Sequence, residues 1–266
     1  MRPDGHKPPE EKSRPGERAE GTEQADSIRL NKYIARAGIC SRRKADEMIA
    51  QGHVSVNGAV VKEMGIRVSE EDEIVVGGRQ ISPRQHVYIL LNKPKDTITT
   101  TDDPKNRHTV MDLIKLPDKE KNGLFPVGRL DRDSVGVLLL TNDGDLAHRL
   151  MHPSFEIDKL YRVRTKRPVK PHELDQLRKG VELEDGLATA DEAAYVALPD
   201  RHEIGLSIHE GRTRQVRRMF EALGHEVVTL TRVRYAGLTA QGVRPGKWRR
   251  LEGQEVRRLL RQVKLK

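Results

Sequence analysis

The run from Val135 to Leu140 constrains the fold more than any other part of the chain. It is apolar at every position except Gly136, and charged residues crowd both of its ends in GRLDRDSVGVLLLTNDGD, residues 128–145. A short apolar run bounded by turn residues is typical of a buried strand. A sizeable core must surround it, and 266 residues are enough for one large domain or for a main domain with a smaller companion.

Other segments between residues 86 and 251 have the alternation or the apolar content of strands: VYILLNKP, LYRVRT, HEIGLSIHE and EVVTLTRV. Helical stretches are expected at about residues 146–151, 172–179 and 214–223. Strands outnumber helices, and the two do not alternate strictly. We therefore predict the α+β fold class, with a mixed, largely antiparallel sheet in a domain that spans residues 86–251.

Residues 28–76 have the pattern of a second, smaller domain. Leu30, Tyr33 and Ile34 recur at helical spacing, and Ser41 is a typical N-cap for a second helix. An Asn57-Gly58 pair between alternating residues is the strongest short signal of a hairpin. We predict a compact helix–helix–hairpin domain, joined to the larger domain by a linker at residues 77–85.

The two ends of the chain differ in composition from the rest. Residues 1–27 hold four Pro, three Gly and twelve charged residues. Ordering such a segment would cost entropy that no burial offsets, so we expect a disordered tail. Residues 252–266 are predicted to form a basic C-terminal tail that ends in a helix.

The overall charge favours a polyanionic partner. The net charge is +9 and the pI is about 9.6, a balance that suits neutralisation of nucleic-acid phosphates. Cys40 is the only cysteine, which excludes an intramolecular disulfide and an all-cysteine zinc site. No apolar run approaches the roughly 20 residues of a membrane helix, and the first residues lack the apolar core of a secretory signal. We expect a cytoplasmic protein, monomeric by default.

A basic corner, defined as Arg36, Arg42, Arg43 and Lys44, surrounds the turn between the two N-terminal helices. One interpretation is a solvated cationic face. The other is a phosphate site, because the amides at the start of the second helix would add to the attraction for an anion.

Three interpretations fit the charged turn that contains Arg129, Asp131, Arg132 and Asp133. The turn could merely solvate the end of a strand. Its aspartates could bind magnesium together with Asp143 and Asp145, but a strand of about 20 Å separates the two pairs, too far for one ion. The third interpretation is that one aspartate is a catalyst, held ionised by neighbouring arginines and able to attack carbon without a metal or cofactor.

The same turn belongs to a set of four motifs in a fixed order. After The set resembles the ribosomal RNA pseudouridine synthases of the group typified by small-subunit synthase A and large-subunit synthase B. RLNKYIARAGICSRRKADEMI followed by GHVSVNG resembles the S4-type RNA-binding domain. Asp96 departs from the usual glycine of the group, and Ser134 from the usual threonine.

The resemblance implies an isomerase that converts a chosen uridine of ribosomal RNA to pseudouridine, with no cofactor and no metal. By motif, Asp131 is the nucleophile or base, Tyr161 lies against the uracil and Arg217 pairs with Asp131. Composition alone favours Tyr161 as a core aromatic of its strand, although an aromatic in a basic strand is noticeable in a chain with only nine Phe, Tyr and Trp residues. The resemblance also assigns RNA-binding roles to Arg129, Arg212, Arg214 and Arg218, and Arg129 would fill the gap left by a flipped base.

A structured stem-loop is the expected target, because flipping is cheapest in loops and bulges. The contexts HRLMHPS and TNDGDLA favour the large ribosomal subunit. Two alternatives remain open. One is a non-catalytic rRNA-binding assembly factor, and the other is a metal-dependent RNA-processing enzyme, which the spacing of the acids disfavours.

Overall fold

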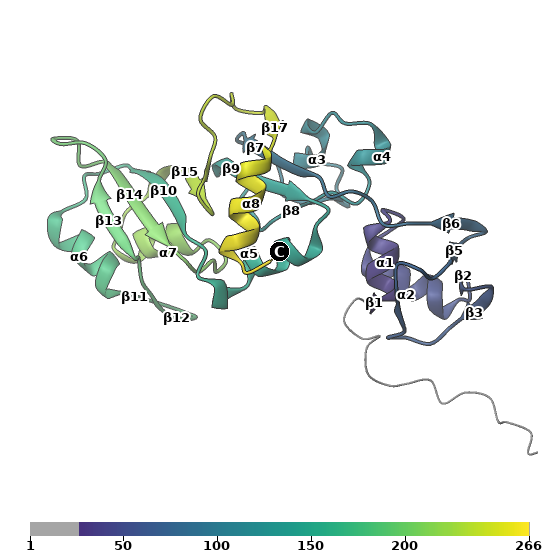
Figure 1. Ribbon diagram of the computed structural model, residues 1–266. Coiled ribbons are helices and arrows are strands. Elements are labelled where there is room, and N and C mark those ends of the chain that lie inside the picture. The colour runs from purple at the N-terminus through teal and green to yellow at the C-terminus, as the bar shows by residue number, and fades with distance from the viewer. Residues whose placement is uncertain (1–26, 266) are drawn as a thin grey trace, which may run out of the picture.

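The computed structural model describes residues 27–265. The segment predicted to be disordered, residues 1–27, lies outside this part of the chain apart from its last residue. Figure 1 shows a small N-terminal domain beside a longer domain that contains the rest of the described chain. Among residues 27–265, no helix has the length and apolar character needed to cross a membrane.

The N-terminal domain contains β1 (Ile28–Arg29), α1 (Leu30–Arg36), α2 (Arg42–Ala50), β2 (Val54–Val56), β3 (Ala59–Val61), β4 (Arg67–Val68), β5 (Ile74–Val76) and β6 (Arg79–Ile81). The predicted helices and hairpin are present: Ser41 caps α2, and Asn57 and Gly58 have the positive φ values of 51° and 82° that the β2–β3 turn requires. The domain extends beyond residue 76, because β6 pairs with β5. Gly77-Gly78 is therefore a hairpin turn and not the start of a linker.

The larger domain contains β7 (Tyr88–Lys93), α3 (Val110–Leu113), α4 (Asp118–Lys121), β8 (Phe125–Pro126), β9 (Val135–Thr141), α5 (Gly144–Met151), η1 (Pro153–Phe155), β10 (Lys159–Thr165), α6 (Pro171–Lys179), β11 (Val181–Leu183), β12 (Gly186–Ala188), β13 (Glu192–Tyr195), β14 (Glu203–Ile208), α7 (Gln215–Ala222), β15 (Val227–Tyr235), β16 (Leu238–Thr239), β17 (Trp248–Arg250) and α8 (Gly253–Gln262).

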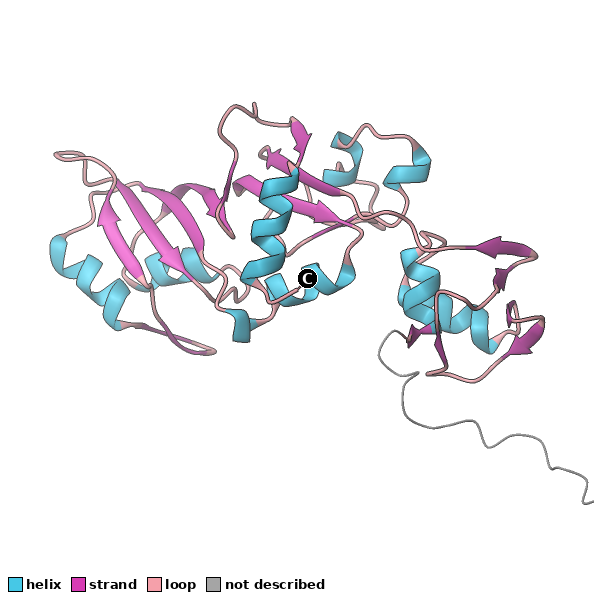
Figure 2. Cartoon of the chain, viewed as in Figure 1, coloured by secondary structure: helices cyan, strands magenta, loops and turns pink. Residues whose placement is uncertain are grey.

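One sheet runs through the larger domain in the order β13-β14-β10-β15-β9-β7-β17 (Figure 2). The pair β9–β15 is parallel, and the other pairs in this order are antiparallel. The predicted mixed, largely antiparallel α+β fold is confirmed. The three predicted helices correspond to α5, α6 and α7 within about two residues at each end.

Strand β9 is buried on both faces, as its apolar run predicts. Leu138 and Leu140 pack into one core with side chains from α3, α6 and α7. Val137 and Leu139 pack into a second core, on the other face of the sheet, with side chains from α5 and α8. The alternation of a strand thus feeds two cores from one short run.

The C-terminal segment is not a free tail. It contains the predicted helix as α8, but Leu259 and Val263 are buried in the second core. The guanidinium of Arg149 donates to the carbonyl oxygens of Val263 and Lys264 at 2.8 and 2.9 Å. The prediction of a basic tail beyond residue 251 missed this packing, because it weighed the charges of the segment above its apolar spacing.

Two polar contacts join the domains. Lys32 of α1 pairs with Asp145 of α5, with 2.6 Å between Nζ and Oδ1. Arg84, between β6 and β7, donates from Nη1 to the carbonyl oxygen of Lys119 at 2.6 Å.

Candidate active site

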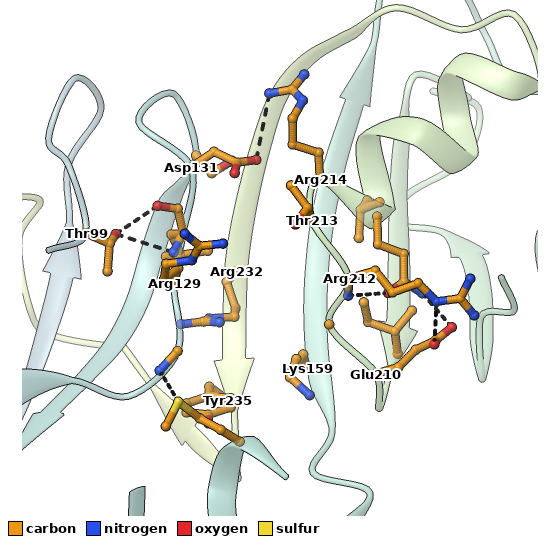
Figure 3. Close-up of a pocket in the computed structure, with 18 of the residues that line it drawn as sticks. Thr99, Arg129, Asp131, Lys159, Glu210, Arg212, Thr213, Arg214, Arg232 and Tyr235 are labelled. Atoms are coloured by element: carbon orange, nitrogen blue, oxygen red, sulfur yellow. Dashed lines mark hydrogen bonds and ion pairs between the residues drawn. The ribbon is translucent and has the colours of Figure 1, made fainter. Parts of the chain in front are cut away.

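A cleft of about 890 Å³ opens beside the loop that precedes β9. Its lining comes from that loop, from strands β10 and β15, and from the segment between β14 and α7. Figure 3 shows Asp131 and Arg129 on one side of the cleft, with Arg212 and Arg214 across from them. The predicted residues Arg129, Asp131 and Tyr161 line this one cleft together with Arg212 and Arg214.

The loop at residues 128–134 is held rigidly by its backbone. The Thr99 hydroxyl donates to the Leu130 carbonyl at 2.8 Å, and the Asp96 amide donates to the Arg132 carbonyl at 2.8 Å. The Lys93 ammonium, fully buried, donates to the carbonyl oxygens of Asp131 at 3.0 Å and Ser134 at 2.7 Å. The position of Asp131 is therefore fixed by contacts that do not involve its own carboxylate.

Sequence analysis missed Lys93, which lies at the end of β7. Burial lowers the pKa of Lys93 to about 8, while the nearby carboxylates of Asp133, Asp131 and Asp96 oppose the decrease. Carbonyl dipoles and distant acids, and no direct ion pair among residues 27–265, thus hold this buried ammonium. The only sequence signal for it is a lysine at the end of an otherwise apolar strand, VYILLNK.

We expect Lys93→Met to lower both stability and turnover, because the carbonyls that face the ammonium would lose a charged donor. Hydrogen bonds from charged groups contribute about 1.5–3 kcal/mol each, so a loss of about 3 kcal/mol in the free energy of unfolding is expected. Urea unfolding and turnover on RNA measure the two effects. The control is Lys95→Met, which removes an exposed lysine from the same loop; equal losses in both variants would contradict the assignment.

Asp131 retains an accessible carboxylate at the edge of the cleft. Its side chain is 33% exposed, and Nη1 of Arg214 lies 3.9 Å from Oδ2. Arg214 is the N-cap residue of α7 and has a left-handed backbone, with φ 52°. Non-glycine residues in this conformation are uncommon and concentrate at functional sites.

The predicted pairing of Arg217 with Asp131 is wrong in this structure. Arg217 is buried, and its Nη2 lies 2.8 Å from Oδ2 of Asp133, while Nη1 donates to the Val227 carbonyl at 3.1 Å. Arg217 thus ties the loop to α7 and to the start of β15, and it lies outside the cleft lining. Arg214 is the arginine nearest to Asp131.

Tyr161 satisfies both interpretations that the sequence left open. Its side chain is 8% exposed and packs in the first core, yet it also lines the cleft. On β10 it stands opposite Arg232 of β15. Its contact with a base stays a prediction.

Two of the predicted RNA-binding arginines have partners within the chain. Arg218 forms a bidentate pair with Asp185, with both distances 2.9 Å. Arg212 pairs with Glu210 at 3.0 Å and donates to the Leu187 carbonyl at 2.7 Å, which holds the β11–β12 hairpin. Arg129, in contrast, is exposed in the cleft and has no ion pair within residues 27–265.

The aspartates of the magnesium interpretation serve four separate purposes. Asp131 and Asp133 face Arg214 and Arg217 as described. Asp143 caps α5, accepting from the amide of Leu146 at 3.0 Å, and Asp145 pairs with Lys32. Their carboxylates do not converge on one point, and no group of three or more His, Cys, Asp or Glu side chains in residues 27–265 is arranged to hold a metal.

Asp96 explains its own departure from the glycine of the resembling group. Its φ is 61°, in the left-handed region that glycine adopts freely and that aspartate tolerates better than most residues. Its carboxylate lies 3.4 Å from Nε of Arg132. The loop therefore keeps the shape that glycine would give it.

The basic corner of the N-terminal domain is largely free. Arg42, Arg43 and Lys44 are exposed in the first turn of α2, whereas Arg36 is half-buried. Lys44 pairs with Glu47 at 2.7 Å, and Arg42 donates to Asn31 at 3.4 Å. Arg43 has neither a hydrogen bond nor an ion pair within the described chain.

Reversing two of these charges, with Arg42→Glu and Arg43→Glu together, should weaken RNA binding. If each arginine contacts a phosphate, the slope of log affinity against log salt should fall by about 2. Activity at saturating RNA should suffer less. The matched control is Lys62→Glu with Arg79→Glu, which makes the same change of charge at exposed sheet positions; if both pairs bind RNA alike across a salt series, the corner is only a solvated face.

Comparison with known proteins gives matches for both domains. Residues 87–222 match the family described as RNA pseudouridylate synthase, and residues 28–74 match the S4 domain. Ribosomal large subunit pseudouridine synthase B of Bacillus subtilis (strain 168) is 47% identical over 236 residues, which cover 87% of this chain and 95% of that protein. The protein of the same name in Vibrio vulnificus (strain CMCP6) is 38% identical, over 90% of this chain and 76% of its own. A solved structure described as a pseudouridylate synthase is 32% identical, with a TM-score of 0.63, and covers 87% of this chain and 99% of its own.

Proposed function

Because this chain belongs to the RNA pseudouridylate synthase family and carries an S4 domain, we propose that it converts a specific uridine of ribosomal RNA to pseudouridine. The observation that carries the proposal is Asp131: an accessible carboxylate at the edge of a cleft, on a loop fixed by Lys93 and Thr99. A preorganised carboxylate beside a basic cleft suits attack on a nucleotide.

Asp131 acts covalently in this proposal. Its carboxylate attacks C1′ of the ribose as the bond between C1′ and N1 breaks, and the bonding electrons leave with the uracil. The uracil turns within the cleft, and C5 forms a bond to C1′ while the bond from C1′ to the Asp131 oxygen breaks. The proton of C5 passes to solvent and N1 gains a proton, so the RNA keeps its composition.

The target uridine must leave its stack to reach Asp131, which costs on the order of a few kcal/mol. Tyr161 borders the cleft and would lie against the uracil. Arg129, exposed and without an ion pair within residues 27–265, is placed to occupy the gap in the stack. Arg214 is the cation nearest to Asp131 throughout, with 3.9 Å between Nη1 and Oδ2.

The large ribosomal subunit is the proposed source of the substrate, and the cytoplasm is its site of action. The support is the name of the relatives in Bacillus and Vibrio together with the coverage of most of both chains. A structured stem-loop is the proposed element, because its bases are cheap to flip and because the basic corner can bind its phosphates. The proposed state is a monomer.

Release of tritium from C5 of labelled uridine tests the reaction, since C5 loses its hydrogen only when it bonds to C1′. The purified chain should release tritium from large-subunit ribosomal RNA transcripts, with chelator present, and leave small-subunit transcripts unchanged. Binding without release would favour the assembly-factor alternative. Complete loss of release in chelator would contradict the metal-free mechanism.

A further inference from the structure

Arg232 of β15 is a buried cation without an acidic partner. It is 2% exposed, and no carboxylate of residues 27–265 lies within ion-pair distance of it. Its Nε donates to the Val137 carbonyl at 2.8 Å, its guanidinium lies 4.6 Å from the ring centroid of Tyr235, and its Nη2 has no hydrogen-bond partner. Burial of a charge with an unpaired donor is costly, so a partner supplied from outside the chain would relieve the cost.

The place of Arg232 in the sheet points that partner toward the cleft. β15 lies between β10 and β9, and Arg232 stands opposite Tyr161 on one side and Gly136 on the other. Arg232 lines the cleft (Figure 3), where its guanidinium lies below Arg129. It therefore lies at the floor of the cleft that Asp131 borders.

Lys159 adds a second cation to this floor. It stands two residues before Tyr161 on β10, so the two side chains share a face of the sheet. Its Nζ donates to the carbonyl oxygens of Ile157 at 2.8 Å and His209 at 2.6 Å, and an ammonium has a third proton to donate. Burial, and then the charge of Arg232, lower the pKa of Lys159 to about 8, while Asp158, Asp191 and Glu210 oppose the decrease.

We infer that Arg232 and Lys159 form a subsite for a phosphate group of the nucleotide whose base enters the cleft. This inference rests on the proposed function and deepens it. Two buried cations without an ion pair match an anion better than a neutral uracil carbonyl, which one neutral donor would satisfy. Glu210, the nearest acid in the lining, already binds Arg212 and Gln215 at 3.0 and 2.7 Å and does not neutralise them.

The subsite divides the cleft into two parts. Asp131 and Arg214 lie at its edge, where the ribose would react, and the two buried cations lie at its floor. A phosphate on the floor would fix the backbone of the flipped nucleotide while the uracil, once detached, is free to turn. Arg232 and Lys159 are thus positioning residues in this account, since they hold a group that does not react.

Binding of 5′-UMP, 3′-UMP and uridine to the full chain, measured by ligand-observed NMR or calorimetry, tests the subsite. The wild type should bind at least one of the two monophosphates about 10-fold or more tighter than uridine, the scale of one charge-assisted hydrogen bond. Arg232→Gln should remove most of this preference and leave the affinity for uridine unchanged. Lys159→Gln should reduce the preference in the same direction, and it carries the test if Arg232→Gln fails to fold in a thermal melt.

The matched control is Arg234→Gln, which removes an arginine of the same strand that pairs with Asp158 at 3.0 Å and does not line the cleft. It should keep the full preference for the monophosphate. Equal affinity of the wild type for uridine and both monophosphates, or an equal effect of Arg234→Gln, would overturn the subsite. An equal loss of uridine and UMP binding in Arg232→Gln would assign Arg232 to the base instead.

The outcome is separable from that of the proposed function. A wild type that releases tritium from ribosomal RNA but binds UMP no better than uridine contradicts the subsite alone. A wild type that prefers UMP but forms no pseudouridine contradicts the proposed reaction and leaves the subsite standing.

Discussion

Asp131→Asn should abolish pseudouridine formation while the protein stays folded. The amide keeps the size of the side chain but is no nucleophile, and we expect a loss of about 10⁴-fold or more, the scale found when one catalytic group is removed from other enzymes. Stability should hardly change, because the loop is held through backbone groups by Lys93 and Thr99, and the carboxylate of Asp131 has only Arg214, 3.9 Å away, as an ion-pair partner.

The matched control is Asp133→Asn, two residues along the same turn. Asp133 pairs with the buried Arg217 at 2.8 Å, so its loss should lower the free energy of unfolding by about 3 kcal/mol and leave the folded fraction active. Tritium release under single-turnover conditions, corrected for the folded fraction by circular dichroism, separates the two variants. Near wild-type release by folded Asp131→Asn would refute the catalytic role.

Gly136→Ala should cost about 3–5 kcal/mol of stability, near the upper end for single substitutions. Gly136 has φ +109°, and a Cβ there would lie 2.2 Å from the carbonyl oxygen of Arg232 on the neighbouring strand. β9 and β15 pair in parallel at this point, with Arg232 opposite Gly136. The side chain can neither adopt the backbone conformation nor fit between the strands.

Gly144→Ala is the control for this effect, from the other end of the same stretch. Gly144 is the first residue of α5, has no positive φ, and a Cβ added there would meet nothing within 4 Å. We expect it to be neutral or to stabilise by about 0.5 kcal/mol. Urea unfolding measures both; coincident transitions for the two variants would show that the close approach of the strands does not require glycine.

The elements of the fold could be predicted because their signals are local. The apolar run at residues 135–140, the N-cap at Ser41 and the Asn57-Gly58 turn each depend on neighbouring residues alone, and each forms as expected. The end of the N-terminal domain was less predictable. Gly77-Gly78 is as typical of a linker as of the hairpin that it forms, and only pairing with β5 decides between them.

The partners within the site could not be read from spacing. Four arginines within residues 212–218 and two aspartates in one turn allow several pairings, and the left-handed backbone of Arg214 directs that residue to Asp131 while Arg217 reaches Asp133. Lys93 and Arg232 were missed for a related reason. A lysine or arginine in a strand is ordinarily a solvated residue, and only tertiary contacts bury these two beneath the loop and the cleft.

Mapping of pseudouridine in ribosomal RNA from a strain that lacks this chain tests the central claim most directly. The account predicts that pseudouridine disappears from large-subunit RNA at a specific uridine in a stem-loop, that the wild-type chain restores it, and that Asp131→Asn expressed at the same level does not. An unchanged map in the strain that lacks the chain, or full restoration by Asp131→Asn, would contradict the account.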